Sequence, residues 1–239
     1  MKRIFGLLTA LLVSSLAVSG ADDRTEVGNR LISSTAVLRD IAGMPDTGIP
    51  QDLINKSVCV VVIPSMKKAG FIFGGNYGKG AMSCRTKMGD GPWSPPSMVL
   101  LGGGSFGLQI GGQAVDLVLL VMNLGGLASL LDSKFTLGGD ASVAAGPVGR
   151  TATAETDAWL SAQILAYSRA RGLFAGLIVK GGVLRPDRDA NIVLYGKPVR
   201  PRTLLIDGLS DSTSPVAQVA KDLQTFTDEL NRISPQKAN

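Results

Sequence analysis

The sequence predicts an α+β fold, in which an antiparallel, glycine-rich β-sheet core is joined by a short N-terminal amphipathic helix and a C-terminal helix. Three observations lead to this prediction. Between residues 57 and 184, small residues repeatedly alternate with larger apolar ones, and a period of two indicates strands. Residues 214–234 repeat apolar side chains at helical spacing, and residues 29–44 carry a shorter stripe of the same kind.

The first strand is expected in SVCVVVIP, residues 57–64, which is rich in β-branched residues and ends at Pro64. We expect a tight turn at residues 65–68 and an antiparallel partner in residues 70–76. Small residues on one face of a strand indicate that another backbone or an aromatic ring approaches that face closely. Such glycine-rich stretches occupy residues 71–80, 101–116, 137–150 and 173–184.

The N-terminal amphipathic helix is expected at residues 29–44. Leu31 and Leu38 lie on one helical stripe, whereas Arg30 and Arg39 lie mostly off it. Such a stripe either packs on the core of the protein or inserts into the interface of a lipid membrane. The periodicity alone favours packing on the core.

The clearest helix is predicted for residues 214–234. Ser214 is a favourable N-cap, and Pro215 stands at the first helical position. We expect the helix to dock on the domain, the alternative being a helix that binds a partner. Its apolar stripe consists of Val216, Val219, Leu223, Phe226, Leu230 and Ile233.

Shorter elements lie between these helices. Residues 50–56 are expected to form one or two helical turns started by proline. Residues 187–195 are expected to form a short helix, with Asp187 as a turn or cap residue rather than a calcium ligand. The prolines and glycines of residues 88–96 indicate a surface loop that holds Trp93.

Residues 1–21 have the pattern of a secretory signal peptide. Lys2 and Arg3 precede the apolar residues 4–18, and residues 19–21 are the small ones that a signal peptidase accepts. The apolar stretch is short for a membrane span, which needs roughly 20 residues, so an uncleaved anchor is the weaker alternative. Removal of this segment leaves 22 basic and 19 acidic residues, a mild net charge of +3.

The sequence contains no histidine, which excludes Ser-His-Asp and Cys-His catalysis and histidine-containing metal sites. Two cysteines cannot form a thiolate metal cage. Ser105 in GGGSFG therefore has no histidine partner for nucleophilic catalysis. We expect a protein that is not an enzyme, with no catalytic residues, no metal and no cofactor.

The two cysteines, Cys59 and Cys84, have two alternative interpretations: they form a disulfide, or they stay unpaired. In the hairpin proposed above, Cys59 would face about residue 75, well short of Cys84. A third strand could still bring Cys84 near. The register favours Cys59 as a small buried apolar residue.

The stretch GGNYGKGA, residues 74–81, looks at first like a phosphate-binding loop. Its spacing matches neither GxxxxGK[ST] nor GxGxxG. A phosphate loop also runs from a strand into a helix, whereas residues 81–85 continue with strand periodicity. We therefore assign these glycines to a pleated surface rather than to a nucleotide site.

Basic residues gather at the expected turns and strand ends. Each of them is ordinarily solvated, but several turns at one edge of a sheet would form a rim that attracts anions. The signal peptide and the scarcity of interleaved aromatic residues argue against nucleic acid as the partner. These residues are Lys67, Lys68, Lys79, Arg85, Lys87, Arg169, Arg171, Lys180 and Arg185.

The chain resembles the SYLF domain family. The resemblance rests on VVVIPSMKKAGFIFGGNYGKGAMSCR, GPWSPPSMVLLGGGSFGLQIGGQAVDLVLLVMN, LGGDASVAAGPVGR and YSRARGLFAGLIVKGGVLRPDRDANIVLYG, which occur in this order within residues 29–197. It implies a non-enzymatic, lipid-binding domain whose N-terminal amphipathic helix and basic residues face the membrane. By position, the lipid-binding candidates are Lys67, Lys68 and Lys79, with Arg30 and Arg39 from the helix.

These observations lead to one main hypothesis: an exported, periplasmic or secreted module that associates peripherally with anionic phospholipid membranes. The alternative is a structural or protein-interaction factor of the cell envelope, and a hydrolase that uses carboxylates alone is a third. The expected domain organisation is a signal peptide at residues 1–21, a SYLF-like domain at residues 29–208, and a helix at residues 214–234 that packs on the domain or is appended to it.

Overall fold

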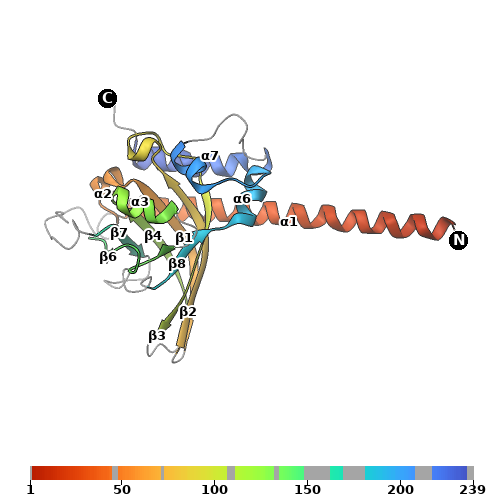
Figure 1. Cartoon of the computed structure of the whole chain (residues 1–239), viewed down its shortest axis with the longest axis horizontal. Coiled ribbons are helices and arrows are strands. Elements are labelled where there is room, and N and C mark those ends of the chain that lie inside the picture. The colour runs from red at the N-terminus through yellow and green to blue at the C-terminus, as the bar shows by residue number, and fades with distance from the viewer. Residues whose placement is uncertain are drawn as a thin grey trace.

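The structure is a computed structural model (Figure 1). Within the ranges given below, side chains are described except at residues 2–21, 68–70, 73–74, 105–106, 111–113 and 217–220. The predictions for Arg169, Arg171, Lys180, Ser214 and Pro215 fall outside the described residues. The structure describes residues 2–44, 48–70, 73–106, 111–131, 135–147, 162–168, 181–207 and 217–235.

In the part of the chain that the structure describes, an eight-stranded sheet forms the core, as the α+β prediction requires. Its strands run in the order β5-β8-β3-β2-β1-β4-β7-β6. All neighbours are antiparallel except β6 and β7, which pair in parallel. The strands are β1 (Cys59–Gly70), β2 (Phe73–Cys84), β3 (Ser97–Phe106), β4 (Gly111–Val121), β5 (Phe135–Thr136), β6 (Val143–Ala145), β7 (Ile164–Ser168) and β8 (Val183–Pro186).

The predicted turn at residues 65–68 is wrong, because β1 continues through it to Gly70. The register of β1 against β4 shifts between Ile63 and Met66, which marks a β-bulge. Proline lacks a backbone N–H and is tolerated at such a bulge. The backbone N–H of Ser65 donates a 2.9 Å hydrogen bond to the carboxylate of Asp116 on β4. The Pro-Ser signal therefore marks an irregularity within one long strand, not its end.

The close approach predicted for the glycine-rich face is found on β2. A Cβ atom at Gly80 would overlap the carbonyl oxygen of Val62, and one at Gly78 would overlap the side chain of Ile63. Both clashes lie beside the bulge of β1. Glycine is therefore required where β2 passes the displaced backbone of its neighbour.

Cys59 and Cys84 form a disulfide, contrary to the interpretation of Cys59 as a free buried residue. The register places these two residues directly opposite each other on β1 and β2. The reason for the difference is that β1 continues past the expected turn to Gly70, so that Cys59 pairs with Cys84 rather than with residue 75. Both cysteines are fully buried.

Residues 29–43 belong to a longer helix, α1 (Lys2–Gly43). Figure 1 shows the N-terminal half of α1 extending away from the rest of the molecule, while its C-terminal half crosses the sheet. Within the part of the chain that is described, no helix combines the length and hydropathy needed to cross a membrane. The other helical elements of the described residues are α2 (Gln51–Lys56), η1 (Lys87–Gly89), α3 (Leu124–Leu131), α6 (Arg188–Tyr195), η2 (Thr203–Asp207) and α7 (Ala217–Ile233).

The apolar stripe of α1 packs on the core. Leu31, Leu38 and Ile41 are buried where α1 lies against β1, β2 and β4 on one side and against α7 on the other. The stripe of α7 is buried in the same way through Phe226 and Leu230. The two terminal helices thus form a layer on the sheet (Figure 1).

The short helix α6 agrees with its prediction. Asp187 caps it, accepting a 3.3 Å hydrogen bond from the backbone N–H of Ala190. Asn191 fixes the helix to β3, because its side chain both accepts from the N–H and donates to the carbonyl of Met98. This anchoring places the carboxylate of Asp187 beneath α1.

Candidate functional site

Two of the predicted lipid-binding residues, Arg30 and Lys79, lie together between α1 and β2. Glu26 accepts hydrogen bonds from both: 2.7 Å from Lys79 Nζ and 3.2 Å from Arg30 Nη2. Arg30 Nη1 donates a further 2.7 Å hydrogen bond to Asp187. Both cations are therefore bound to carboxylates of the protein itself.

The pocket around these residues has a volume of about 310 Å³ and is rich in carboxylates. Asp23, Glu26, Asp187 and Asp189 line it, against Arg30 and Lys79. The hydrogen bond from Lys79 holds the pKa of Glu26 below its ordinary value, and the same bond raises the pKa of Lys79. This arrangement ties α1 to the sheet and offers little free positive charge to an anion.

Arg39, also predicted to bind lipid, joins α1 to α7. Its Nε and Nη2 donate to one carboxylate oxygen of Glu229, at 3.2 and 3.0 Å. Arg232 donates to the other oxygen of the same carboxylate. Glu229 is buried, whereas both arginine side chains remain more than half exposed.

Lys67 and Lys68 lie within β1, not in a turn. Lys67 pairs with Tyr77 on β2 and with Ala114 on β4, and its side chain is exposed. The side chain of Lys68 lies outside the described residues. The structure thus brings Arg30 and Lys79 together but separates Arg39, which binds α7, from Lys67, which projects from the middle of the sheet.

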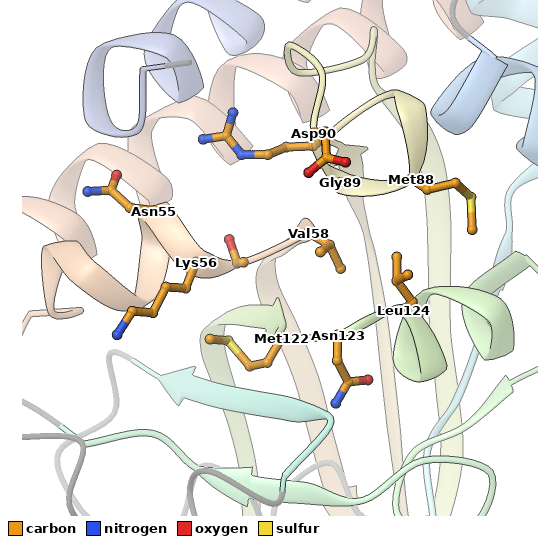
Figure 2. Close-up of a pocket in the computed structure, with 11 residues that line it drawn as sticks. Asn55, Lys56, Val58, Met88, Gly89, Asp90, Met122, Asn123 and Leu124 are labelled. Carbon is orange, nitrogen blue, oxygen red and sulfur yellow. The ribbon is translucent and has the colours of Figure 1, made fainter. Parts of the chain in front are cut away.

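A larger pocket, of about 800 Å³, lies at the other end of the central strands. The end of α2, the start of β1, the end of β2, η1 and the start of α3 meet there. Figure 2 shows Asn55 and Lys56 on one side of it, Met88 and Leu124 on the other, and Val58 between them. The Cys59–Cys84 disulfide joins β1 and β2 at this end of the sheet, and Val58, just before β1, and Arg85, just after β2, line the pocket.

Arg85 is the buried cation of this pocket and is only 7% exposed. Its guanidinium stacks over the ring of Trp93, with its carbon 4.4 Å from the ring centroid. Its Nη2 donates to the carbonyl and the hydroxyl of Ser234, at 3.1 and 2.8 Å. Trp93 donates to that same carbonyl. Burial lowers the pKa of Arg85, but an arginine remains charged in proteins.

The loop after Arg85 has an unusual backbone. Lys87 and Met88 both have left-handed conformations, with φ of 53° and 58°. Residues with side chains seldom adopt this region, and such strain gathers at functional positions. Gly89 follows with φ of 110°, and its N–H donates to the carbonyl of Thr86. The loop holds Met88 at the pocket with 42% of its surface exposed.

The mouth of the pocket combines exposed apolar side chains with exposed cations. Leu124 is 47% exposed on the same side of the pocket as Met88 (Figure 2). Lys56 lines the pocket, Lys87 precedes Met88, and both lysines are exposed. This combination suits the boundary between water and a lipid layer, where apolar side chains insert and cations attract anionic headgroups.

The sequence contained only a weak signal for this pocket. Arg85 is one of several basic residues in the sequence, and no pattern links it to Trp93 or to Ser234, which follows 149 positions later. A tryptophan in a Pro-Gly loop, eight residues after an arginine at a strand end, was the available hint. Among the described residues, no group of His, Cys, Asp and Glu could hold a metal ion.

Comparison with known proteins gives the family. Residues 102–230 match the family described as "Ysc84: Las17-binding protein actin regulator". The chain belongs to the Ysc84 family. SYLF is the same domain family, so the resemblance found in the sequence is confirmed. The match reaches residue 230 and therefore includes most of α7, which the resemblance had left outside the domain.

Several curated relatives share the Ysc84 domain. An SH3 domain-containing protein of Schizosaccharomyces pombe is 36% identical over 179 residues, covering 74% of this chain and 41% of that protein. LAS seventeen-binding protein 3 of Saccharomyces cerevisiae is 36% identical over 163 residues, covering 67% and 35%. The human SH3 domain-containing YSC84-like protein 1 is 31% identical over 199 residues, covering 81% and 57%.

The chain spans between about a third and a little over half of the length of these three relatives. No solved structure matches it.

Proposed function

We propose that this Ysc84-family chain is a non-enzymatic module that binds anionic phospholipid membranes. The observation that supports this function is the mouth of the larger pocket, where exposed Met88 and Leu124 stand beside exposed Lys56 and Lys87. Each basic residue near an anionic surface contributes about 1 kcal/mol of attraction. The two apolar side chains contribute further to binding by inserting into the headgroup region.

This proposal moves the membrane contact away from the stripe of α1. Leu31 and Leu38 are buried against the sheet and α7, so membrane insertion of that stripe would require α1 to leave the fold. The paired cations Arg30 and Lys79 would likewise have to give up Glu26 and Asp187. Lys67, exposed on β1, remains a candidate for direct headgroup contact.

Co-sedimentation of the full-length chain with vesicles tests the proposal. Phosphatidylcholine vesicles with graded amounts of phosphatidylglycerol should retain the protein in proportion to their anionic content, and added salt should release it. The charge reversals Lys56→Glu and Lys87→Glu should each weaken binding about tenfold, taken as a difference of about 1.4 kcal/mol. Equal binding to neutral and anionic vesicles would refute the proposal.

Lys221→Glu is the matched control for these reversals. Lys221 is exposed on α7, about 20 Å along the helix axis from Ser234, at 1.5 Å per residue. It changes the net charge by the same amount without touching the pocket mouth. Equal losses in all three variants would show that net charge alone governs binding.

Export is the second part of the proposal. We propose that residues 1–21 are removed and that the mature protein acts in the periplasm or outside the cell. The ion pairs that join α1 to β2 and α6 start from Glu26 and Arg30, so they would persist after this cleavage. N-terminal sequencing of protein recovered from the periplasm or the medium should begin near Asp22; recovery in the cytoplasm with an intact N-terminus would contradict export.

A protein partner is the alternative function, and the relatives named as Las17-binding favour it. Ile32, 51% exposed on α1, is an apolar residue that such a partner could cover. Pull-down from an envelope extract, with Ile32→Glu as the variant, distinguishes the two functions. A single partner that is lost with this substitution, together with absent vesicle binding, would favour the protein-interaction module.

A further inference from the structure

We propose that the pocket at Arg85 is a recognition site for one phosphate group. This inference rests on the proposed function, because it identifies the part of an anionic lipid that the chain would recognise. The ligand class is a phosphate monoester or diester, present either in a phospholipid headgroup or in a soluble phosphate ester.

Arg85 is held in place before any ligand arrives. Trp93 covers one face of its guanidinium, and Ser234 accepts two hydrogen bonds from Nη2. Trp93 and Arg85 share the Ser234 carbonyl, and the Ser234 N–H in turn donates to Leu230 at 2.8 Å. A guanidinium fixed in this way loses little conformational freedom on binding, which favours affinity.

The guanidinium retains donors for a ligand. Nη2 is occupied by Ser234, but Nε and Nη1 donate to no acceptor among the described residues. Arginine presents its N–H groups as a planar fork that matches two oxygens of a phosphate. Neither nitrogen is fully buried, so a ligand oxygen can reach both of them.

The charge of Arg85 is only partly balanced. No carboxylate of a described residue lies within 4.0 Å of its nitrogens. The carbonyl of Ser234 stands at the C-terminal end of α7, which carries roughly half a negative charge. A fraction of the positive charge therefore remains for an anion, in contrast to Arg30, whose guanidinium already binds two carboxylates.

The rest of the lining fits a single phosphate ester. Lys56 adds a second cation, and Asp90 opposes it, so the lining carries an excess of one positive charge. This balance suits one phosphate better than a polyphosphate. Asn55 and Asn123 offer amide donors, while Met88, Met122, Leu124 and Val58 offer apolar surface for an attached carbon chain. The volume, about 800 Å³, lies within the usual range for ligand pockets.

Fluorescence of Trp93 provides a direct readout, because its ring stacks on the side chain that would bind the ligand. The chain has two tryptophans, so a full-length Trp159→Phe background isolates Trp93. Inorganic phosphate and glycerol 3-phosphate are titrated at constant ionic strength, with sodium acetate and a polyglutamate peptide as comparisons. We expect a saturable change with the two phosphates and none with the comparisons.

Two variants locate the response. Arg85→Lys keeps the charge but loses the fork, and it should weaken phosphate binding at least tenfold. Arg85 also anchors α7, so its substitution can lower the stability of the protein. Lys56→Gln provides an independent test, because Lys56 is exposed and holds no other element in place. We expect this variant to lose phosphate affinity several fold. Lys221→Gln should bind as the unsubstituted protein does.

Vesicles containing phosphatidic acid or phosphatidylglycerol separate the sources of phosphate. A response to both vesicles and soluble esters, lost in the two variants, supports the site and the membrane function together. A response to soluble phosphates without vesicle binding supports the site and refutes the membrane function. Binding to anionic vesicles that is unchanged in Arg85→Lys but weakened in Lys56→Glu and Lys87→Glu overturns the phosphate site and leaves the membrane function standing. An equal response to polyglutamate also overturns it, in favour of an acidic peptide.

Discussion

The Arg30 guanidinium on α1 lies 2.7 Å from the carboxylate of Asp187, the residue that caps α6. Both side chains are nearly buried, at 7% and 11% exposure. These residues are 157 positions apart in the chain, and their contact closes the layer of helices over the sheet. Together with Glu26 and Lys79, they make the positive charge of this region part of the fold rather than of its outer surface.

Substitution of Arg30 should therefore act on stability first. Arg30→Ala leaves the buried carboxylate of Asp187 without its ion pair, and we expect the free energy of unfolding to fall by about 3 kcal/mol. Urea denaturation followed by circular dichroism measures this loss. The exposed Arg24→Ala on the same helix is the control and should change stability by less than about 0.5 kcal/mol. Equal effects of the two substitutions would show that the Arg30–Asp187 pair contributes nothing.

The disulfide between Cys59 and Cys84 should contribute about 3 kcal/mol, because it closes a loop across a sequence separation of 25 residues. The double substitution Cys59→Ala/Cys84→Ala removes this constraint from the unfolded chain. We expect the urea midpoint of the unsubstituted protein to fall on reduction and that of the variant to stay constant. A midpoint that is insensitive to reductant in the unsubstituted protein would contradict the assignment.

Glu229 gives the fold a definite dependence on pH. Burial acts to raise its pKa, but hydrogen bonds from Arg232 and Arg39 outweigh this, so the pKa lies below the ordinary 4.5. A lowered pKa means that the contribution of the carboxylate is complete above pH 4.5 and is lost as the pH falls through the folded-state value. The difference in unfolding free energy between the unsubstituted protein and Glu229→Gln should therefore be largest near neutral pH.

The same difference should shrink as the solution is acidified below pH 4.5. Urea denaturation of both proteins at a series of pH values measures it. The exposed Asp228→Asn, one residue earlier on α7, provides a control for a carboxylate without these two arginines. A difference that is constant from pH 7 to strong acid would mean that the ion pairs of Glu229 add no stability.

The sequence predicted an element correctly where the local residue pattern alone determines its secondary structure. The stripe of α7, the cap of α6 and the β-branched run of β1 each follow from local periodicity or from one capping residue. It was misleading where a local signal had two meanings. Pro64 and Ser65 are typical of a turn, but a bulge uses the same residues, and only the pairing with β4 decides between them.

The larger pocket could not be predicted because its parts come from distant segments. Arg85 directly follows β2, Trp93 lies in the loop after it, and Ser234 follows α7. Each residue alone has an ordinary structural explanation. Their meeting depends on where α7 docks, which depends on burial of a stripe whose partner surface is formed by the whole sheet and α1.

The docking of α7 should be strongly cooperative with the core. Phe226 is fully buried in the layer between α7 and the rest of the domain. Phe226→Ala should lower the free energy of unfolding by about 4 kcal/mol, since it removes a large buried ring and leaves a cavity. Thr225→Ala, at the adjacent exposed position, should change it by less than about 0.5 kcal/mol.

The phenylalanine substitution also tests whether α7 holds the pocket in place. If Ser234 positions Arg85, loosening α7 should expose the Trp93 ring, and its fluorescence should shift to the red before the sheet unfolds. Near-ultraviolet and far-ultraviolet circular dichroism follow the two events separately. A Phe226→Ala protein that keeps both its stability and its Trp93 emission would show that α7 is an appended helix, with no part in the core or in the pocket.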